Sequence, residues 1–135
     1  MAQTDSRPPA TKGDGVLIAT EYLTAMEARD FALAKTFLDP AVEMIFPGPV
    51  VFRELEAIAE WAGARYRRVG KAFERVDSFA ADDGEVVVIQ GTLHGEWLDG
   101  TPFEGIRFVD WFLIRNRRIV SQRVFNDLAE VAKAR

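Results

Sequence analysis

An aspartate interrupts the most apolar stretch of this sequence and is the first candidate for chemistry. Asp110 lies within the hydrophobic run 106–114. A carboxylate buried there without a partner would cost several kcal/mol, so it should pair with a cation, stay protonated or face a cavity. Each arrangement is typical of a site in which an acid binds or transfers a proton. The alternatives are that Asp110 lies on a solvated sheet face, or pairs structurally with Arg107 or Arg123.

The single histidine, His94, is the second candidate, because imidazole titrates near neutral pH. It shares a strand face with Gln90 and Thr92, and a pair with Asp110 would make an acid–base couple. Its place before Gly95, near a strand end, suits a surface or interface histidine as well. One histidine, no cysteine and no HExxH spacing exclude thiol chemistry and typical zinc sites. We therefore expect neither a metal nor a cofactor.

The composition indicates one globular domain without a polyanionic partner. The 135 residues are 48% hydrophobic, enough for one core with a small pocket. A net charge of -4 argues against binding to nucleic acid or to an anionic membrane. No apolar run approaches the roughly 20 residues that span a bilayer, and the start lacks a secretory signal, so we expect a cytoplasmic protein. Two basic clusters are interpreted as solvated faces: Arg65, Arg67 and Arg68, and Arg115, Arg117 and Arg118.

Helical periodicity precedes extended segments along the chain. A polar segment, 1–14, is expected to be flexible, and residues 15–135 to form a single domain. The helices are expected at about 15–29, with Asp14 as a possible cap, then from Asp30 to a stop at Asp39-Pro40, and again at 55–66. A short strand, 42–46, should end at the turn 47–49.

The second half of the sequence predicts four successive strands joined by short turns, which must run antiparallel. They are expected at 73–80, 85–97, 103–114 and 118–126, before a terminal helix near Asp127. The predicted class is α+β, with three N-terminal helices on one side of a curved, mainly antiparallel sheet. Such an arrangement forms a cone with an internal pocket.

Three phrases of the sequence carry a resemblance to a known family: the opening LIATEYLTAMEARDFALAKTFL, the following DPAVEMIFPG and the closing GTLHGEWLDGTPFEGIRFVDWFLIRNRRIVSQRVFND. Together with the order of elements, they resemble the nuclear transport factor 2-like superfamily, which includes SnoaL-like polyketide cyclases and ketosteroid isomerase. The resemblance covers roughly residues 16–127. These phrases are diffuse, so they specify a fold more strongly than a reaction.

The resemblance to ketosteroid isomerase implies roles for single residues. Tyr22 and Asp110 stand where that enzyme has its oxyanion hole, a pair that polarises a carbonyl oxygen. Its general base aligns with Ile45 or the neighbouring Met44, so authentic steroid isomerisation is not expected. The Asp-Arg-Asp mechanism of limonene epoxide hydrolase, another relative, is disfavoured because Phe108 stands at the arginine position.

Pocket residues follow from strand alternation and from the same resemblance. On the strand of Asp110, Phe108 and Phe112 share its face, and Gln122 and Asn126 should point inward from the last strand. Asn126 is equally suited to capping the terminal helix. The aromatic candidates for shaping an apolar ligand site, each of which could instead be core, are Phe46, Trp61, Tyr66, Phe108 and Phe112.

The opposite face of the same strand carries Val109, Trp111 and Leu113, a set of apolar groups that would be an exposed patch unless covered. In the resembled family this face commonly forms a homodimer interface, so we expect a homodimer through the outer sheet face. The sequence predicts a small-molecule pocket protein, an isomerase, cyclase or dehydratase that moves protons on an apolar carbonyl compound. The alternative is a noncatalytic ligand-binding or dimerisation module of the same fold.

Overall fold

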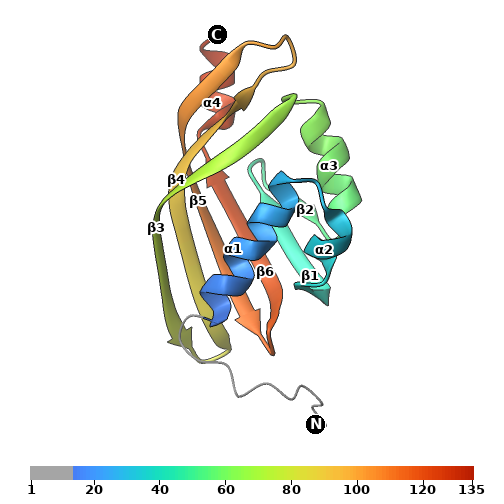
Figure 1. The fold of residues 1–135 in the computed structure, drawn as a ribbon, viewed down its shortest axis with the longest axis vertical. Coiled ribbons are helices and arrows are strands. Elements are labelled where there is room, and N and C mark those ends of the chain that lie inside the picture. The colour runs from blue at the N-terminus through green and yellow to red at the C-terminus, as the bar shows by residue number, and fades with distance from the viewer. Residues whose placement is uncertain (1–13) are drawn as a thin grey trace.

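The computed structural model describes residues 14–135, in which helices pack against a six-stranded curved sheet (Figure 1). The α+β class predicted from the sequence is confirmed. The helices are α1 (Asp14–Glu27), α2 (Phe31–Lys35), α3 (Leu55–Gly63) and α4 (Leu128–Lys133). The strands are β1 (Leu38–Phe46), β2 (Val50–Phe52), β3 (Arg68–Ala81), β4 (Gly84–Glu96), β5 (Pro102–Arg115) and β6 (Arg118–Asn126). Within this part of the chain, no helix is long and apolar enough to cross a membrane.

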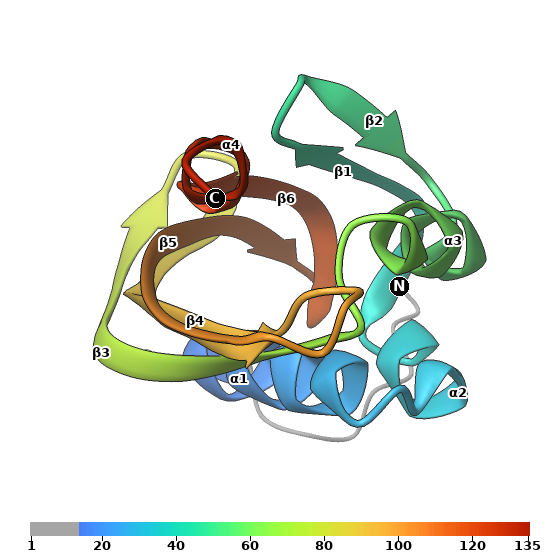
Figure 2. The same ribbon diagram turned by 90° about the horizontal axis from the view of Figure 1, so that it is seen from above.

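The sheet has the order β2-β1-β6-β5-β4-β3, so its last four strands in sequence are neighbours in space. Those strands pair antiparallel, as their short turns require. The pairing of β1 with β6 is parallel, and it joins the first half of the chain to the second. Viewed from above, β3 to β6 bend into an open ring, with α1 beside β3 and β4 and with α3 near β1 and β2 (Figure 2). The sheet therefore has a concave face that the helices partly cover.

In the first half of the chain, two predicted boundaries need correction and one strand was not predicted. The second helix ends at Lys35 rather than Leu38, because Leu38 already pairs with Ile119 in β6. Strand β1 thus includes Asp39 and Pro40, at a point where its pairing is irregular and a proline can be tolerated. The turn after β1 leads into an unpredicted three-residue strand, β2, which pairs back on β1.

Other boundaries shift by a few residues. Helix α3 ends at Gly63, so Tyr66 lies in the link to β3, and β3 begins at Arg68, earlier than expected. The expected flexible segment lies outside the described residues except for Asp14, which is the first residue of α1.

Strand β5 shows the predicted alternation of buried and more exposed side chains from Ile106 to Trp111, whereas Phe112, Leu113 and Ile114 are all buried. Ile106, Phe108 and Phe112 are buried on the concave side, whereas Val109 is 36% exposed on the other. Asp110 has no exposed surface at all. The strand therefore places an acid among large apolar side chains at the centre of the sheet.

Candidate functional site

A cavity of about 160 Å³ lies between the helices and the concave face of the sheet. Its apolar wall combines side chains from α1, from α3 and from the strand ends, and polar groups interrupt that wall at a few points. The polar and aromatic lining residues used below are Tyr22, Glu27, Arg29, Phe46, Trp61, Arg65, Tyr66, Arg68, Lys71, Gln122 and Asn126. That this cavity binds a ligand stays a prediction.

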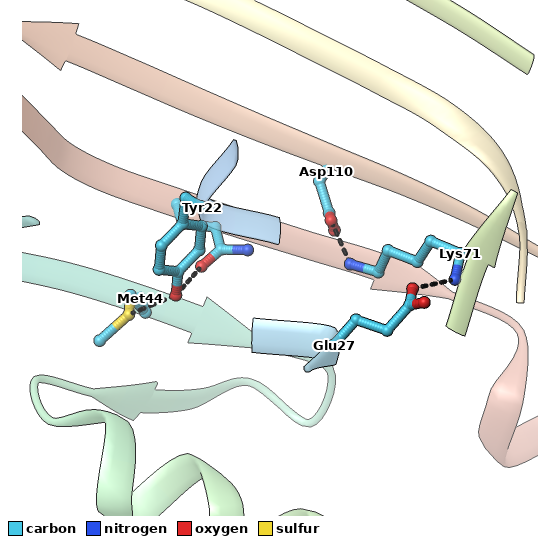
Figure 3. Close-up of polar contacts among 6 residues, drawn as sticks. Tyr22, Glu27, Met44, Lys71 and Asp110 are labelled. Atoms are coloured by element: carbon cyan, nitrogen blue, oxygen red, sulfur yellow. Dashed lines mark hydrogen bonds and ion pairs between the residues drawn. The ribbon is translucent and has the colours of Figure 1, made fainter. Parts of the chain in front are cut away.

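Lys71 is the partner of the buried aspartate. Its Nζ contacts Asp110 Oδ2, and the lysine side chain is 20% exposed while that of Asp110 is fully buried (Figure 3). The other oxygen, Asp110 Oδ1, has no hydrogen-bond partner among the described residues. Burial raises the pKa of Asp110, and the positive charge of Lys71 opposes that rise. Lys71 lines the cavity and Asp110 does not, so the charge of Asp110 affects groups in the cavity through its contact with Lys71.

Strand β3 positions this lysine. A register shift between Phe73 and Arg75 marks a bulge, a feature that bends a strand. Gly91 lies opposite Phe73, where a Cβ would come within 1.9 Å of the carbonyl oxygen of Ala72, so only glycine allows β3 to approach so closely. Glu27, at the end of α1, also holds the edge strand β3 in place, because its Oε1 accepts a hydrogen bond of 2.9 Å from the backbone N–H of Lys71 (Figure 3).

Tyr22 lies on the cavity wall with a weakly engaged hydroxyl. It is 1% exposed and donates at 3.4 Å to Gln122 Oε1 and at 3.6 Å to Met44 Sδ (Figure 3). Hydroxyl hydrogen bonds are usually near 2.7 to 2.8 Å, so a ligand oxygen could compete well for this donor. Burial raises the pKa of Tyr22, and the negative charge of Asp110 raises it further. The phenol therefore remains a neutral donor across the physiological pH range.

Aromatic side chains and an arginine form another part of the wall. Phe46, Phe52 and Trp61 pack edge to face, with ring centroids 5.4 to 5.5 Å apart. The Arg65 guanidinium lies 4.4 Å from the centroid of Trp61. Burial raises the pKa of Tyr66, while the charges of Arg65 and Arg29 oppose that rise. The interpretation of this cluster as a solvated face is wrong for Arg65, which is half-buried on the cavity wall. It holds for Arg67 and Arg68, whose side chains are 60% exposed, although Arg68 also borders the cavity.

Some of the predicted site residues line the cavity, and the others lie in the core or on the surface. Tyr22, Phe46, Trp61, Tyr66, Gln122 and Asn126 line the cavity. Asn126 also accepts a hydrogen bond of 3.1 Å from Leu128 N, so both of its expected roles are compatible. A binding role for each residue stays a prediction.

Phe108 and Phe112 lie behind the cavity wall instead of on it. Lys71 Nζ lies 4.9 Å from the Phe108 ring centroid, and Phe112 packs edge to face on Tyr22 at 6.1 Å. Both aromatic rings are buried core residues that support a residue of the wall.

His94 does not meet Asp110. It is exposed and lies across the β3–β4 ladder from Gly70, beside the inward-facing Leu93. The structural alternative, pairing of Asp110 with Arg107, is not observed either, since Arg107 pairs with Asp127.

Sequence reasoning missed Lys71 as the partner of Asp110. The available signal was that Val69, Lys71 and Phe73 alternate along one face of β3, so a cation stands between two inward-facing apolar residues. That signal is weak, because long lysine side chains are common on exposed edge strands.

The fold and the site together define a class of protein: a small α+β domain whose helices and curved sheet enclose a pocket above a buried acid. The family model described as the SnoaL-like domain matches residues 19–122, most of the chain. The chain therefore belongs to the SnoaL-like family, within the NTF2-like superfamily. No curated protein matches its sequence.

Solved structures share this fold at low sequence identity. A protein proposed to be a SnoaL-like polyketide cyclase, from Jannaschia sp. CCS1, is 22% identical, with a TM-score of 0.72 over 95% of this chain and 94% of that one. TerC, co-crystallised with polyporic acid, is 17% identical, with a TM-score of 0.73 over 89% and 96%. An NTF2-like protein of unknown function from Burkholderia pseudomallei is 16% identical, with a TM-score of 0.72 over 89% and 95%. These likenesses establish the fold and leave the reaction open.

Proposed function

We propose that this protein is an enzyme that transfers protons on a small, largely apolar molecule bearing a carbonyl group, as an isomerase, cyclase or dehydratase. The observation that carries the proposal is the Lys71–Asp110 pair, because the lysine lines the same cavity as the hydroxyl of Tyr22. In this proposal the cavity is lined both by a hydroxyl that donates a hydrogen bond to a carbonyl oxygen, that of Tyr22, and by a group that accepts and returns protons, Lys71. This combination is what enolisation of a carbonyl compound requires.

The two groups would divide the reaction between them. The Tyr22 hydroxyl donates a hydrogen bond to the carbonyl oxygen and stabilises the negative charge that develops there. Burial favours the protonated form of Asp110, so in the proposed reaction this carboxylate accepts a proton across its contact with Lys71. With the proton on Asp110, the Lys71 amine accepts a proton from the carbon next to the carbonyl. The resulting ammonium then returns that proton to a different atom, which completes an isomerisation.

The pair also explains how the domain can lack the base implied by the resemblance. Neither Met44 nor Ile45 supplies a carboxylate, and Met44 is buried against the Tyr22 hydroxyl. In our proposal Lys71 takes the role of the base. The noncatalytic alternative is favoured by the same loss, together with apolar groups on the outer sheet face such as Phe125, which is 58% exposed. That face would then serve a homodimer whose pocket only binds a ligand.

Exchange of carbon-bound protons with solvent tests the proposal without knowledge of the natural product. Small cyclic ketones such as cyclohexanone are incubated in D₂O, and the loss of their α-proton signals is followed by NMR. We expect the wild-type protein to accelerate the exchange, and Lys71→Met and Asp110→Asn to lower it by about 100-fold, the usual contribution of a positioned acid or base. The matched control is Lys35→Met, since Lys35 is exposed and paired with Glu56.

Melting temperatures measured on the same samples separate chemistry from folding. Folded variants that have lost exchange support the enzyme. If no ketone in the panel exchanges faster with the wild type, or if folded Lys71→Met retains the full rate, the proton-transfer proposal fails.

A further inference from the structure

The mostly apolar wall of the cavity carries more cations than anions, although the protein as a whole is acidic. Four lining residues are cations, Arg29, Arg65, Arg68 and Lys71, and one is an anion, Glu27. The whole chain carries a net charge of -4. A surplus of positive charge around one apolar cavity is therefore a local property of the cavity, and it is not explained by the overall composition.

Two of these cations are already neutralised within the fold. Lys71 pairs with Asp110, and Arg68 pairs with Glu96 at 3.1 Å. Glu27 is also occupied, since it accepts the hydrogen bond from the Lys71 backbone. The unneutralised charge of the wall is thus concentrated on the remaining two arginines.

Arg29 and Arg65 form no ion pair with a carboxylate anywhere in residues 14–135. The Cζ atom of Arg65 lies 4.4 Å from the centroid of the Trp61 ring, a contact that leaves the guanidinium N–H groups available for other acceptors. Both arginines line the cavity and both act electrostatically on the Tyr66 hydroxyl, so they belong to the same part of the wall. Because Arg29 is exposed and Arg65 half-buried, that part is at the opening of the cavity.

The backbone at Arg29 supports a functional role for its side chain. Arg29 has a φ of 59°, in the left-handed region, and its N–H closes the end of α1 by bonding to Met26 O at 3.0 Å. Glycine or asparagine is the usual residue at such a helix end, because other side chains are strained there. An arginine in this place points to a use for the guanidinium.

The volume limits what can enter beneath the arginines. A cavity of about 150 Å³ holds a molecule of benzene, and this one measures about 160 Å³. The wall is apolar and includes the aromatic side chains of Phe46 and Trp61. The buried part of a ligand is therefore one ring in size, and far smaller than a steroid.

We propose that the cavity binds a single-ring organic acid, with its carboxylate at Arg29 and Arg65 and its ring against the aromatic wall. This inference names the substrate class of the proposed proton-transfer site and rests on it for its catalytic meaning. The end of the ring opposite the carboxylate then faces Tyr22 and Lys71. A carbonyl or hydroxyl group placed there would meet the donor and the base.

Calorimetric titration of the intact chain with benzoate and phenylacetate tests the binding. The neutral controls are benzamide and phenylacetamide, which have nearly the same shape, and benzylammonium carries the opposite charge. We expect the acids to bind about tenfold more tightly than the amides, as for hydrogen bonds to a charged group. The preference should shrink with added salt, because the arginines are near solvent.

Arginine variants locate the carboxylate. Arg65→Gln and Arg29→Gln should each weaken benzoate binding by about tenfold and leave benzamide binding unchanged. Arg53→Gln is the matched control, because Arg53 is exposed, pairs with Glu43 and lies off the cavity wall. Unchanged amide binding and melting temperature show that a variant has kept its fold. Equal binding of acids and amides, or full benzoate affinity in both variants, would overturn the proposal.

Ring size is tested with 1-naphthoate, which we expect to bind more weakly than benzoate. Equal or tighter binding of the two-ring acid would refute the single-ring limit. Benzoate has no exchangeable α-proton, so its binding is independent of the ketone exchange. Failure of acid binding with persisting exchange removes only this inference, whereas acid binding without exchange removes the proposed catalysis.

Discussion

The side chains of Lys71 and Asp110 meet across an intervening strand. Lys71 belongs to β3 at the edge of the sheet and Asp110 to β5, with β4 between them. The curvature of the sheet brings the two together on its concave side, as the ring of strands in Figure 2 shows. An acid at the centre of the core is thereby connected to the cavity by a flexible cation.

Removal of the lysine should destabilise the protein in a pH-dependent manner. Lys71→Met leaves Asp110 buried without its cation, which we expect to lower the free energy of unfolding by about 3 kcal/mol at pH 7. The folded-state pKa of Asp110 is raised already in the wild type, and loss of Lys71 should raise it further. A raised carboxyl pKa means that the folded state holds the proton more tightly than the unfolded state.

The sign of the pH effect follows from this difference. The stabilisation from a protonated Asp110 is complete below the unfolded pKa of about 3.9, and it is lost as the pH rises through the folded pKa. Urea unfolding between pH 4 and pH 8 should thus show stability falling with pH more steeply in Lys71→Met than in the wild type. Parallel curves would mean that Lys71 does not control the ionisation of Asp110.

Loss of the tyrosine hydroxyl should affect chemistry more than stability. Its hydrogen bonds are long, at 3.4 and 3.6 Å, so Tyr22→Phe should cost at most about 1 kcal/mol of unfolding free energy. Loss of an oxyanion donor typically costs about 100-fold or more in rate. We therefore expect exchange of ketone α-protons to fall by that factor while the melting temperature changes little. Tyr66→Phe, on the same wall, is the comparison, and an equal loss in both variants would contradict a specific role for Tyr22.

The hydrogen bond from Lys71 N–H to Glu27 should hold the edge of the sheet. Glu27→Ala removes the acceptor, and we expect the Lys71 amide to exchange with solvent about five- to tenfold faster, as for loss of about 1 kcal/mol. Hydrogen exchange followed by NMR measures this rate. Glu27→Gln keeps an oxygen acceptor and should retain most of the protection, while Glu21→Ala on the exposed face of α1 should have no effect. Equal protection in wild type and Glu27→Ala would show that the bond contributes nothing.

Dimer formation through the outer sheet face remains a prediction with a simple test. Phe125 is 58% exposed beside Val109, its cross-strand neighbour. Phe125→Lys should convert a dimer to a monomer in light scattering after size exclusion, because a lysine would be buried without a partner. Leu17→Lys is a matched control, since Leu17 is also 58% exposed but lies on α1. A wild-type protein that is monomeric at high micromolar concentration would rule out this interface.

Much of the fold could be predicted from local patterns. The four long strands were predicted to within a few residues, because alternation and turn residues act over neighbouring positions. The errors lie where distant pairing decides the local structure. Leu38 belongs to a strand because Ile119 lies next to it, and β2 exists because β1 provides an edge for it to pair with.

The sequence by itself placed Asp110 in the most apolar strand of the chain and left open whether it faces the core or a solvated side. The structure buries it completely. The sequence also determined the family, through phrases spread along nearly the whole chain. Only the tertiary structure decided which cation meets the acid, since Lys71 is 39 residues away and contacts it by the bending of a sheet. The convergence of Arg29 and Arg65 at the opening of the cavity was decided in the same way. Contacts of this kind depend on how elements pack in space, and no spacing along the chain records them.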